Sequence, residues 1–502
     1  MINEEKIMFT TSAFGKNDIR GIYGEDITEE IFYYTGKGFV KYLLSNIDVD
    51  IKDLWITVCM DARTHSPMLV ESLIKGVRDT GANIVDLGIA PTPLGYYSEV
   101  VGVPKDITNG NPISGALIVT ASHNPSQYNG LKMTYNKQSL NEEQIKLVKK
   151  YTEEEFEAKT TETSQGSCVK YDIIPQYQAE IEKSFNDLKG DLKDITVVVD
   201  SGNGTGGVVA PKLYRDLGCN VIELFSEPDG RFPNHHPNPS DPKNLEHIKK
   251  AVVENKADFG IAFDGDSDRI GVVDSKGEQL TGDKLLLIYA LDLLDTWTDK
   301  SKKPIVVSEV KCSQVLYDTI NNNGGEAVMC KTGHGYIKST MKERGAILAG
   351  EMSGHTFFKD RYYGFDDAVY AGLRIIEIVN KHKNQDKNFV IEDMLGAFNK
   401  VSTSPELRLP CPNELKKPVL EGFKSYVNNN MDCFGCDIKE IITLDGMRIV
   451  FDGGFALIRQ SNTEPVFTLR FEGKTEKDCD NYRTVMVNKL NELIEELGTV
   501  RS

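Results

Sequence analysis

Apolar and polar positions alternate with two different periods along most of the chain. Three short apolar runs rich in β-branched residues predict strands at 55–60, 83–88 and 116–120. Apolar residues recur at helical spacing in the neighbouring segments 27–46 and 67–81. Strand and helix signals that alternate in this way are typical of a layered α/β domain.

Both of these helices carry a boundary signal. Asp26 and Glu29 stand at the spacing of a capping box, in which two side chains satisfy free backbone N–H groups of the first turn. Gly81 is placed to end the second helix. These residues favour a helix start near 27 and a helix end near 81.

The alternating pattern starts again twice further along the chain. ITVVVD at 195–200 and PIVVSEV at 304–310 each predict the first strand of a new α/β unit. A charged helix over 143–159 and a polar stretch at 160–167 separate the first unit from the second. The repetition predicts three similar units and hints at internal duplication.

The C-terminal part of the chain follows a different pattern. Prolines 405, 410, 412 and 418 mark a boundary, and the strand-like runs GMRIVFD, GFALIRQ and VFTLRFEG then follow one another without helices between them. A long helix is predicted over 475–497, which makes this part α+β. We expect four domains, at 1–165, 166–280, 281–398 and 399–502.

The acidic composition narrows the classes of partner. The chain has 58 lysines and arginines against 75 aspartates and glutamates, a formal charge of −17. Such a charge disfavours nucleic acid and anionic membrane, so we expect neither as a partner. An anionic small molecule remains compatible if its pocket is locally basic.

Cysteine usage and the apolar segments favour a cytoplasmic protein. The nine cysteines form no framework of short spacings, which is typical of reduced thiols. Cys433 and Cys436 form one CxxC, but a zinc site needs two further ligands, so we interpret them as unrelated thiols. The N-terminal residues resemble no secretory signal, and no segment is apolar enough to span a membrane.

Three aspartates alternate in DGDSDR, at 264–269 between the runs GIAF and IGVVD. In an extended segment, Asp264, Asp266 and Asp268 point to one side, where their carboxylates repel one another unless a hard divalent cation binds. A plain turn is the alternative. Arg269 stands sixth where an EF-hand needs glycine, and Ser275 stands twelfth where it needs glutamate, so Mg²⁺ is favoured over Ca²⁺.

A glycine-rich stretch offers a competing function. Gly202, Gly204 and Gly207 in DSGNGTGG satisfy the GxGxxG pattern of dinucleotide-binding proteins, and Glu223 stands near the position of a ribose-binding acid. The pattern predicts a dinucleotide-dependent oxidoreductase. A simple tight turn from strand to helix explains the same glycines.

Three polar loops suit phosphate or sugar ligands. RQSNTEP at 459–465 offers an arginine fork, two hydroxyls, an amide and turn N–H groups, a combination that suits a phosphate. GEMSGH at 350–355 presents alternate polar groups between glycines, as polyhydroxyl recognition requires, and KTGHGYIK at 331–338 is similar in style. Each of these loops also fits a surface turn.

A fourth polar loop, TASHNPSQYNGLK at 120–132, follows a predicted strand. Its proline and Asn-Gly pair are turn chemistry, but Ser122 and His123 stand side by side with Lys132 a short loop away. Arg20, in the glycine-punctuated segment DIRG, fits an ordinary salt bridge.

Taken together, these motifs resemble those of the α-D-phosphohexomutase superfamily. They occur in order over nearly the whole chain, as DIRG, TASHNP, DGDSDR, GEMSGH and RQSNTEP. GEMSGH, KTGHGYIK and the following GFDDA are most similar to the bacterial-type phosphomannomutase/phosphoglucomutase branch. The resemblance implies three similar α/β domains with mixed sheets between helices plus a C-terminal α+β domain, around a central active-site cleft.

The resemblance also implies a reaction. Phospho-Ser122, beside Mg²⁺ bound by Ser122, Asp264, Asp266 and Asp268, donates its phosphate to a hexose monophosphate of mannose or glucose. A hexose 1,6-bisphosphate forms, turns over while bound, and returns its other phosphate to Ser122. Such an enzyme is an isomerase of carbohydrate metabolism, an intramolecular phosphotransferase, and glucose 1,6-bisphosphate is its activator.

The resemblance gives roles to the remaining candidate residues. Lys132 is the general acid or base, provided that Arg20 and Arg269 lower its pKa. Arg20 is a second catalytic candidate beside the reacting phosphate, and His123 and Arg269 support the phosphoserine. Two groups bind the substrate: Glu351, Ser353, Lys311, His334 and His355 for the sugar, and Arg459, Ser461, Asn462 and Thr463 for the phosphate that is not reacting. A mobile fourth domain is expected to exclude water.

Other functions remain open at this point. A phosphoglucosamine mutase or a Mg²⁺-dependent sugar phosphatase would use the same serine and metal. The oxidoreductase has no catalytic partner in the sequence, and a silent sugar-phosphate binder would not need Ser122 and all three aspartates.

Overall fold

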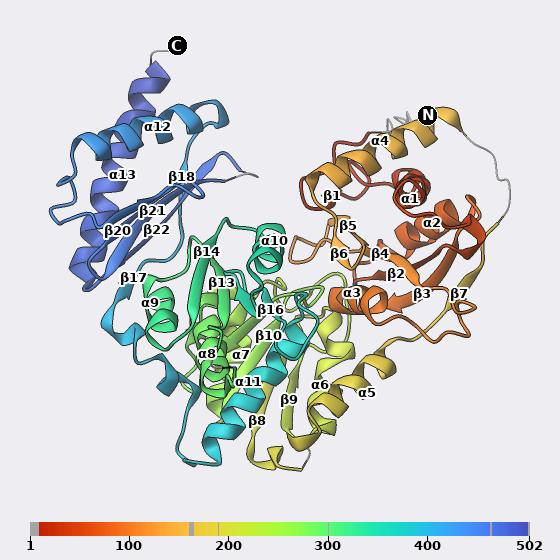
Figure 1. Cartoon of the computed structure of the whole chain (residues 1–502), viewed down its shortest axis with the longest axis horizontal. Coiled ribbons are helices and arrows are strands. Elements are labelled where there is room, and N and C mark those ends of the chain that lie inside the picture. The colour runs from red at the N-terminus through yellow and green to blue at the C-terminus, as the bar shows by residue number, and fades with distance from the viewer. Residues whose placement is uncertain (1–9, 160–164, 189, 300, 462–463, 500–502) are drawn as a thin grey trace. The chain divides into compact units, whose positions relative to one another are not determined.

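The structure is a computed structural model, which describes residues 10–159, 165–188, 190–299, 301–461 and 464–499 (Figure 1). The chain divides into two compact units. The first contains Met1–Leu280, Gly354–Thr356 and Phe365–Val390, and the second contains Thr281–Ser353, Phe357–Gly364 and Ile391–Ser502. Among the described residues, no helix is both long and apolar enough to cross a membrane.

The first unit begins with a mixed sheet in the order β1-β5-β4-β2-β3-β7, with β6 paired to β5. α1, α2 and α4 pack together, whereas α3 packs against β2 and β4. Antiparallel pairing of β4 with β5 places Lys132 opposite Ile118. The elements are β1 Ile19–Ile22, α1 Glu29–Leu44, β2 Trp55–Met60, α2 Ser66–Arg78, β3 Asn83–Ile89, α3 Thr92–Val100, β4 Ile113–Val119, β5 Tyr128–Tyr135, β6 Gln138–Ser139, α4 Glu142–Ala158 and β7 Cys168–Lys170.

A second sheet of the same unit has the order β12-β11-β10-β8-β9. Helix α7 packs on β8 and β10, and α11, from a much later part of the chain, packs on β11. The elements are α5 Ile174–Ser184, β8 Thr196–Asp200, α6 Ala210–Asp216, β9 Asn220–Leu224, α7 Glu246–Asn255, β10 Phe259–Phe263, β11 Ile270–Val273, β12 Gln279–Leu280 and α11 Ala368–Lys383.

The second unit contains a four-stranded sheet and an antiparallel sheet. The first has the order β14-β13-β15-β16, and the other has β17-β22-β21-β20-β19, with β18 paired to β22. Helices α12 and α13 pack on the antiparallel sheet. The elements are α8 Gly282–Thr296, β13 Ile305–Glu309, α9 Gln314–Asn322, β14 Glu326–Cys330, α10 His334–Arg344, β15 Leu348–Gly350, β16 Thr356–Phe358, β17 Ser402–Thr403, β18 Leu407–Pro410, α12 Asn413–Asn429, β19 Glu440–Ile442, β20 Met447–Phe451, β21 Gly454–Gln460, β22 Val466–Gly473 and α13 Glu476–Thr499.

One strand order is repeated in the first three sheets. It reads β5-β4-β2-β3, then β11-β10-β8-β9, then β16-β15-β13-β14. If the four strands of each repeat are numbered in chain order, their order across the sheet is fourth, third, first, second. The third and first strands are parallel in all three sheets, and in the first two sheets the fourth strand is antiparallel to the third. The prediction of three similar α/β domains with mixed sheets plus an α+β domain is confirmed.

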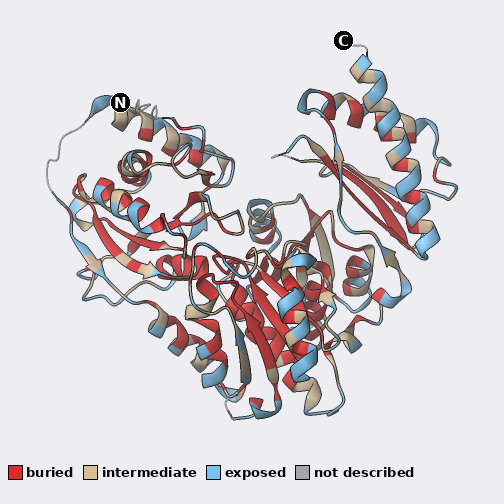
Figure 2. Ribbon diagram, turned by 180° about the vertical axis from the view of Figure 1, so that it is seen from behind, coloured by how far each residue is buried: buried red, intermediate tan, exposed pale blue. Residues whose placement is uncertain are grey.

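The polar loops occupy one place in this repeated topology. The connection from the third to the fourth strand is 120–127 in the first repeat, 264–269 in the second and 351–355 in the third. These connections leave the carboxyl ends of parallel strands, where ligands bind in open α/β sheets. Figure 2 shows that many central strands are buried, while many helices keep exposed outer faces. The strands that precede these connections, β4, β10 and β15, are largely buried.

The predicted capping box at Asp26 is wrong. Helix α1 begins at Glu29, and Thr28 is its N-cap, whose side chain accepts from the Ile31 N–H. The Asp26 carboxylate instead accepts from the backbone N–H of Ile22, in the turn after β1. The Ile22 N–H thus binds the Asp26 side chain, which is therefore not available to cap the helix.

The loop that contains Ser122, residues 120–127, is called the serine loop. The Asn-Gly pair that follows it lies within a strand rather than a turn. Asn129 and Gly130 belong to β5, and a Cβ on Gly130 would lie 2.2 Å from the carbonyl oxygen of Ile19 in β1. The glycine is therefore needed for close approach of two strands.

Candidate functional site

Ser122 lies in the loop between β4 and β5, in a backbone conformation that serine rarely adopts. Its φ is +50°, and its side chain is buried. The hydroxyl donates to Asp264 Oδ2 over 2.8 Å and lies 3.2 Å from His123 Nδ1. A left-handed conformation costs a non-glycine residue about 1 kcal/mol or more, so the surrounding structure must hold it.

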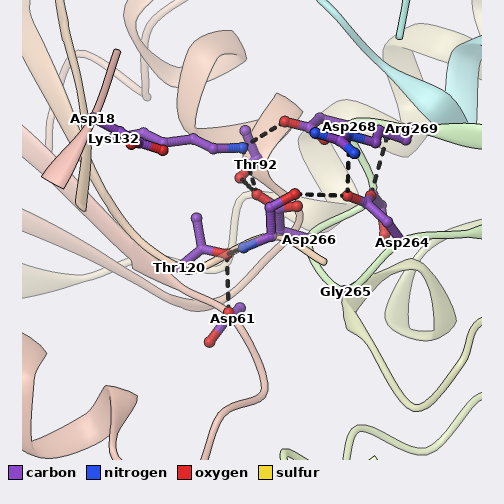
Figure 3. A network of polar contacts seen from close by, with 12 residues as sticks. Asp18, Asp61, Thr92, Thr120, Lys132, Asp264, Gly265, Asp266, Asp268 and Arg269 are labelled. Atoms are coloured by element: carbon purple, nitrogen blue, oxygen red, sulfur yellow. Dashed lines mark hydrogen bonds and ion pairs between the residues drawn. The ribbon is translucent and has the colours of Figure 1, made fainter. Parts of the chain in front are cut away.

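The aspartates of DGDSDR converge as predicted, but the loop is a turn rather than an extended segment. Ser267 has φ +61° and donates its N–H to the carbonyl of Asp264. The turn brings oxygen atoms of Asp264, Asp266 and Asp268 within 4.8 Å of one another, all three residues being buried. Figure 3 shows the three carboxylates facing a common space.

The second repeat packs closely against the serine loop. A Cβ on Gly265 would lie 2.6 Å from the carbonyl oxygen of Ser122, and a Cβ on Gly204 would lie 2.7 Å from the carbonyl oxygen of Gly265. Glycine at both positions lets the three backbones stack. The glycine-rich loop thus supports the aspartate loop, and Glu223 is paired with Arg215 rather than free for a ribose.

The aspartate cluster fits a divalent cation. Asp266 Oδ1 is buried and has no hydrogen-bond partner among the described residues. Burial raises the pKa of Asp264 well above its usual range, and repulsion from the carboxylates of Asp268 and Asp266 adds to the effect. Buried oxygen donors of this kind suit a hard metal ion.

Lys132 reaches the same cluster from β5. Its Nζ lies 2.6 Å from Asp266 Oδ2 and 2.5 Å from Asp268 Oδ2. Burial lowers the pKa of Lys132, but the two carboxylates outweigh it and raise the pKa well above the usual value. The expectation that Arg20 and Arg269 lower this pKa is wrong, because the charges nearest to Lys132 are the carboxylates of Asp266 and Asp268.

Arg269 and two histidines flank the cluster. Arg269 Nε lies 3.3 Å from His355 Nε2, and its Nη1 lies 3.4 Å from His123 Nε2. Burial, together with Arg269 and Arg20, lowers the pKa of His123 well below its usual value, so this ring is neutral. His123 and Arg269 thus lie beside Ser122, as the resemblance implies.

His355 contacts the metal loop, residues 264–269. Its Nε2 is 3.4 Å from Asp268 Oδ1, and Arg269 and His355 form a β-bridge. The chain passes from the second unit to the first between Ser353 and Gly354, so the residues of GEMSGH belong to both units. That His355 binds the sugar together with Glu351 stays a prediction.

Arg20 is held at the edge of the serine loop. Its guanidinium donates to Asp18 over 2.5 Å and to the side chain of Asn124 over 3.0 Å. The Nε is buried without a hydrogen-bond partner among the described residues. Arg20 therefore keeps an unused donor in a region crowded with anionic groups.

The predicted sugar residues of the second unit gather around a buried acid that the sequence reasoning missed. Glu309, at the end of β13, accepts from Thr332 Oγ1 over 2.5 Å and from the Met352 N–H over 3.1 Å. Its Oε1 lies 3.5 Å from Lys311 Nζ. Glu309 thereby ties the Lys311 segment to the loops of KTGHGYIK and GEMSGH.

Glu351 and its neighbours lie close to this acid. Glu351 is buried and accepts from the backbone N–H of Gly333 over 2.9 Å, and its Oε2 is 3.5 Å from Ser353 Oγ. His334 begins helix α10 directly after Gly333. Glu351, Ser353, Lys311 and His334 therefore occupy connected loops of the second unit.

The predicted phosphate loop is described only in part. Arg459 Nε donates to Asp445 Oδ2 over 3.1 Å, and Asp445 also accepts from the Thr332 N–H over 3.1 Å. Ser461 Oγ accepts from the Glu464 N–H. Asn462 and Thr463 lie outside the described residues.

Four domain models of one family match the chain in order. Their descriptions are phosphoglucomutase/phosphomannomutase alpha/beta/alpha domains I, II and III and the C-terminal domain. They match residues 11–159, 175–277, 281–395 and 406–489 respectively.

Individual proteins are similar over nearly their whole length. A phosphomannomutase/phosphoglucomutase of Pseudomonas aeruginosa is 37% identical over 482 residues, 95% of each chain. A phosphoglucomutase of Neisseria gonorrhoeae is 36% identical, covering 93% of this chain and 94% of its own. A crystal structure of a phosphoglucomutase/phosphomannomutase family protein from Burkholderia thailandensis superposes with a TM-score of 0.84 at 34% identity, covering 97% of this chain and 98% of its own.

Proposed function

Because this chain belongs to the phosphoglucomutase/phosphomannomutase family, we propose that it interconverts hexose 1-phosphate and hexose 6-phosphate, with mannose, glucose or both as the sugar. It is an isomerase that works by intramolecular phosphoryl transfer. The observation that carries the proposal is the Ser122 hydroxyl, 2.8 Å from a carboxylate of the buried aspartate cluster. A hydroxyl in this position suits a nucleophile that alternates between free and phosphorylated forms.

The proposed metal is Mg²⁺, held by Asp264, Asp266 and Asp268 together with the phosphorylated oxygen of Ser122. When bound, it neutralises the phosphate oxygens and orients them for in-line transfer. The buried, unpartnered oxygen of Asp266 supports this assignment. Arg269, Arg20 and His123 bind or orient the same phosphoryl group from the other sides.

Lys132 is our candidate for holding and moving the proton of the reacting hydroxyl. Asp266 and Asp268 keep Lys132 protonated and hold its Nζ beside the transfer site. Lys132 can therefore give its proton to Ser122 Oγ when the phosphoryl group leaves that oxygen for the sugar. In the reverse step the neutral lysine takes the proton back, which activates the serine as a nucleophile.

The second unit supplies the proposed substrate contacts. Glu351 and Ser353 bind sugar hydroxyls, with Lys311 and His334 beside them, and His355 of the first unit, which is bridged to Arg269, also contributes. Arg459, Ser461, Asn462 and Thr463 grip the phosphate that is not reacting. Glucose 1,6-bisphosphate primes Ser122 and is the bound intermediate of the glucose reaction. We also propose the four domains with the boundaries given above.

The proposal is tested by following the reaction directly. The protein is incubated with Mg²⁺, a trace of glucose 1,6-bisphosphate and either mannose 1-phosphate or glucose 1-phosphate, and ³¹P NMR follows formation of the 6-phosphate. We expect isomerisation that depends on the bisphosphate, and the two rates rank the sugars. Release of free phosphate without isomerisation would mean a phosphatase, and conversion of glucosamine phosphate alone would mean a phosphoglucosamine mutase.

Glu351→Gln is expected to weaken substrate binding. The change removes the charge that accepts hydrogen bonds from sugar hydroxyls, and a hydrogen bond to a charged group contributes about 1.5–3 kcal/mol, or roughly 10–100-fold in kcat/KM. Steady-state kinetics with glucose 1-phosphate measure the loss. Glu326→Gln, at an exposed residue paired with Arg344, is the control, and equal losses in both variants would contradict the role of Glu351.

A further inference from the structure

Arg63 is a buried arginine whose guanidinium is devoted to the serine loop. It lies between β2 and α2 and is 1% exposed. Nη2 donates to the carbonyl oxygens of Ser122 over 3.0 Å and Asn124 over 2.6 Å. Nη1 donates to the carbonyl oxygens of Pro125 over 2.6 Å and Tyr128 over 3.0 Å. One side chain thus binds the backbone of the loop at four places.

Asp61 completes the arrangement. Its Oδ2 accepts from Arg63 Nε over 2.9 Å and from Thr120 Oγ1 over 2.9 Å. Thr120 Oγ1 in turn accepts from the backbone N–H of Ser122 over 2.8 Å. Figure 3 shows the link between Thr120 and Asp61. The N–H and the C=O of Ser122 are therefore both fixed by one buried ion pair, the first through Thr120 and the second directly.

Arginine is essential to this set of hydrogen bonds. A guanidinium has five N–H donors in a planar fork, and Arg63 uses all five, four on carbonyls and one on Asp61. Burial lowers the pKa of Arg63 and Asp61 opposes the shift, but arginine stays charged at any ordinary pH. Phe232 of the second repeat covers the guanidinium at 5.3 Å from its ring centroid. A lysine, with three donors and no fork, cannot satisfy the same carbonyls.

We propose that Arg63, with Asp61, is the positioning residue of the nucleophile: it holds Ser122 in its φ of +50° so that Oγ points at Asp264. The inference rests on the proposed function, because positioning matters only if Ser122 accepts and donates phosphate. In-line transfer is sensitive to such placement, and a displacement of 1 Å costs about 100-fold in rate.

The test is Arg63→Lys in the full-length protein, with Arg78→Lys as the matched control. Arg78 is an arginine of the same domain that also donates to a backbone carbonyl, that of Gly166 over 2.8 Å. For Arg63→Lys we expect kcat to fall about 100-fold while KM for glucose 1-phosphate stays within about 3-fold. The single-turnover rate at which glucose 1,6-bisphosphate phosphorylates Ser122, followed by intact-protein mass, is expected to fall with kcat. Arg78→Lys is expected to change neither.

Thr120→Val provides a second route if Arg63→Lys folds poorly. It removes the link from Asp61 to the Ser122 N–H, and Thr120→Ser keeps that link and is expected to restore most of the rate. Full-rate phosphorylation of Ser122 in folded Arg63→Lys or Thr120→Val would overturn the inference, as would equal slowing in Arg78→Lys. If the wild-type protein isomerises neither sugar, the proposed function itself is overturned. This outcome is distinguished from failure of the inference about Arg63, because it is seen in the wild type before any variant is measured.

Discussion

Ser122→Ala is expected to abolish bisphosphate-dependent isomerisation. The change removes the one oxygen of the protein that the proposed mechanism phosphorylates, and loss of a nucleophile typically costs about 10⁴-fold or more in kcat. The measurement is the conversion of glucose 1-phosphate by ³¹P NMR, together with intact-protein mass after incubation with the bisphosphate. No phosphoryl group is expected on the variant.

Ser126→Ala is the control for this experiment, because Ser126 belongs to the same loop and its backbone carbonyl, which alanine keeps, lies 3.0 Å from His65 Nε2. Its activity is expected to stay near that of the wild type. Isomerisation by Ser122→Ala at more than a few per cent of the wild-type rate would mean that another group carries the phosphate.

Asp266→Asn is expected to abolish both activity and stabilisation by Mg²⁺. The change removes one of the three proposed anionic ligands. Loss of a residue that only supports a metal ligand already lowers metal affinity about 10–100-fold, so loss of a ligand is expected to lower Mg²⁺ affinity about 100-fold or more. In the wild type, Mg²⁺ at about 100 times its Kd stabilises the folded state by about 2.7 kcal/mol, because the ion binds the native protein alone. Thermal unfolding with and without Mg²⁺ measures this difference as a shift in Tm.

Asp274→Asn is the matched control. Asp274 is also buried in the second repeat, but its carboxylate accepts from the backbone N–H groups of Lys276 and Glu278 in a turn after β11. This variant is expected to lose some stability and to keep its Mg²⁺-dependent shift in Tm. An unchanged shift in Asp266→Asn would place the metal elsewhere.

The strands that could be predicted are those whose own residues decide their burial. β2 was predicted at 55–60 and found at Trp55–Met60, because WITVCM is apolar except for Thr57 and rich in β-branched residues. β5 was not predicted, because YNGLKMTY contains an Asn-Gly pair and a buried lysine whose reasons lie in distant partners. A side chain at residue 130 would clash with the carbonyl of Ile19, so Gly130 is required there. Lys132 is paired with Asp266 and Asp268. No local sequence pattern reveals these contacts.

The chemistry-bearing residues were easier to predict than those that hold them. Ser122 and the three aspartates belong to dense polar motifs, so their composition stands out even without a structure. Asp61 and Glu309 were missed because each is a single acid at the end of an apolar strand. The same signal recurs at Asp200, which ends β8, accepts from the Gly202 N–H and pairs with His235. An acid at the end of the first strand, or directly after it, was therefore visible in every repeat as VCMD, VVVD and VVSE.

Those three strand ends show what the repeated topology allows. In each repeat an acid that ends the first strand fastens a loop of its own repeat: Asp61 through Thr120, Asp200 at Gly202, and Glu309 at Met352. The proposed nucleophile, the proposed metal ligands and most of the proposed sugar contacts come from three separate repeats. On this assignment, substitutions in the third repeat are expected to change sugar preference while the sequences of the other two repeats stay the same. The repeated framework thus separates specificity from phosphoryl chemistry in the proposed enzyme.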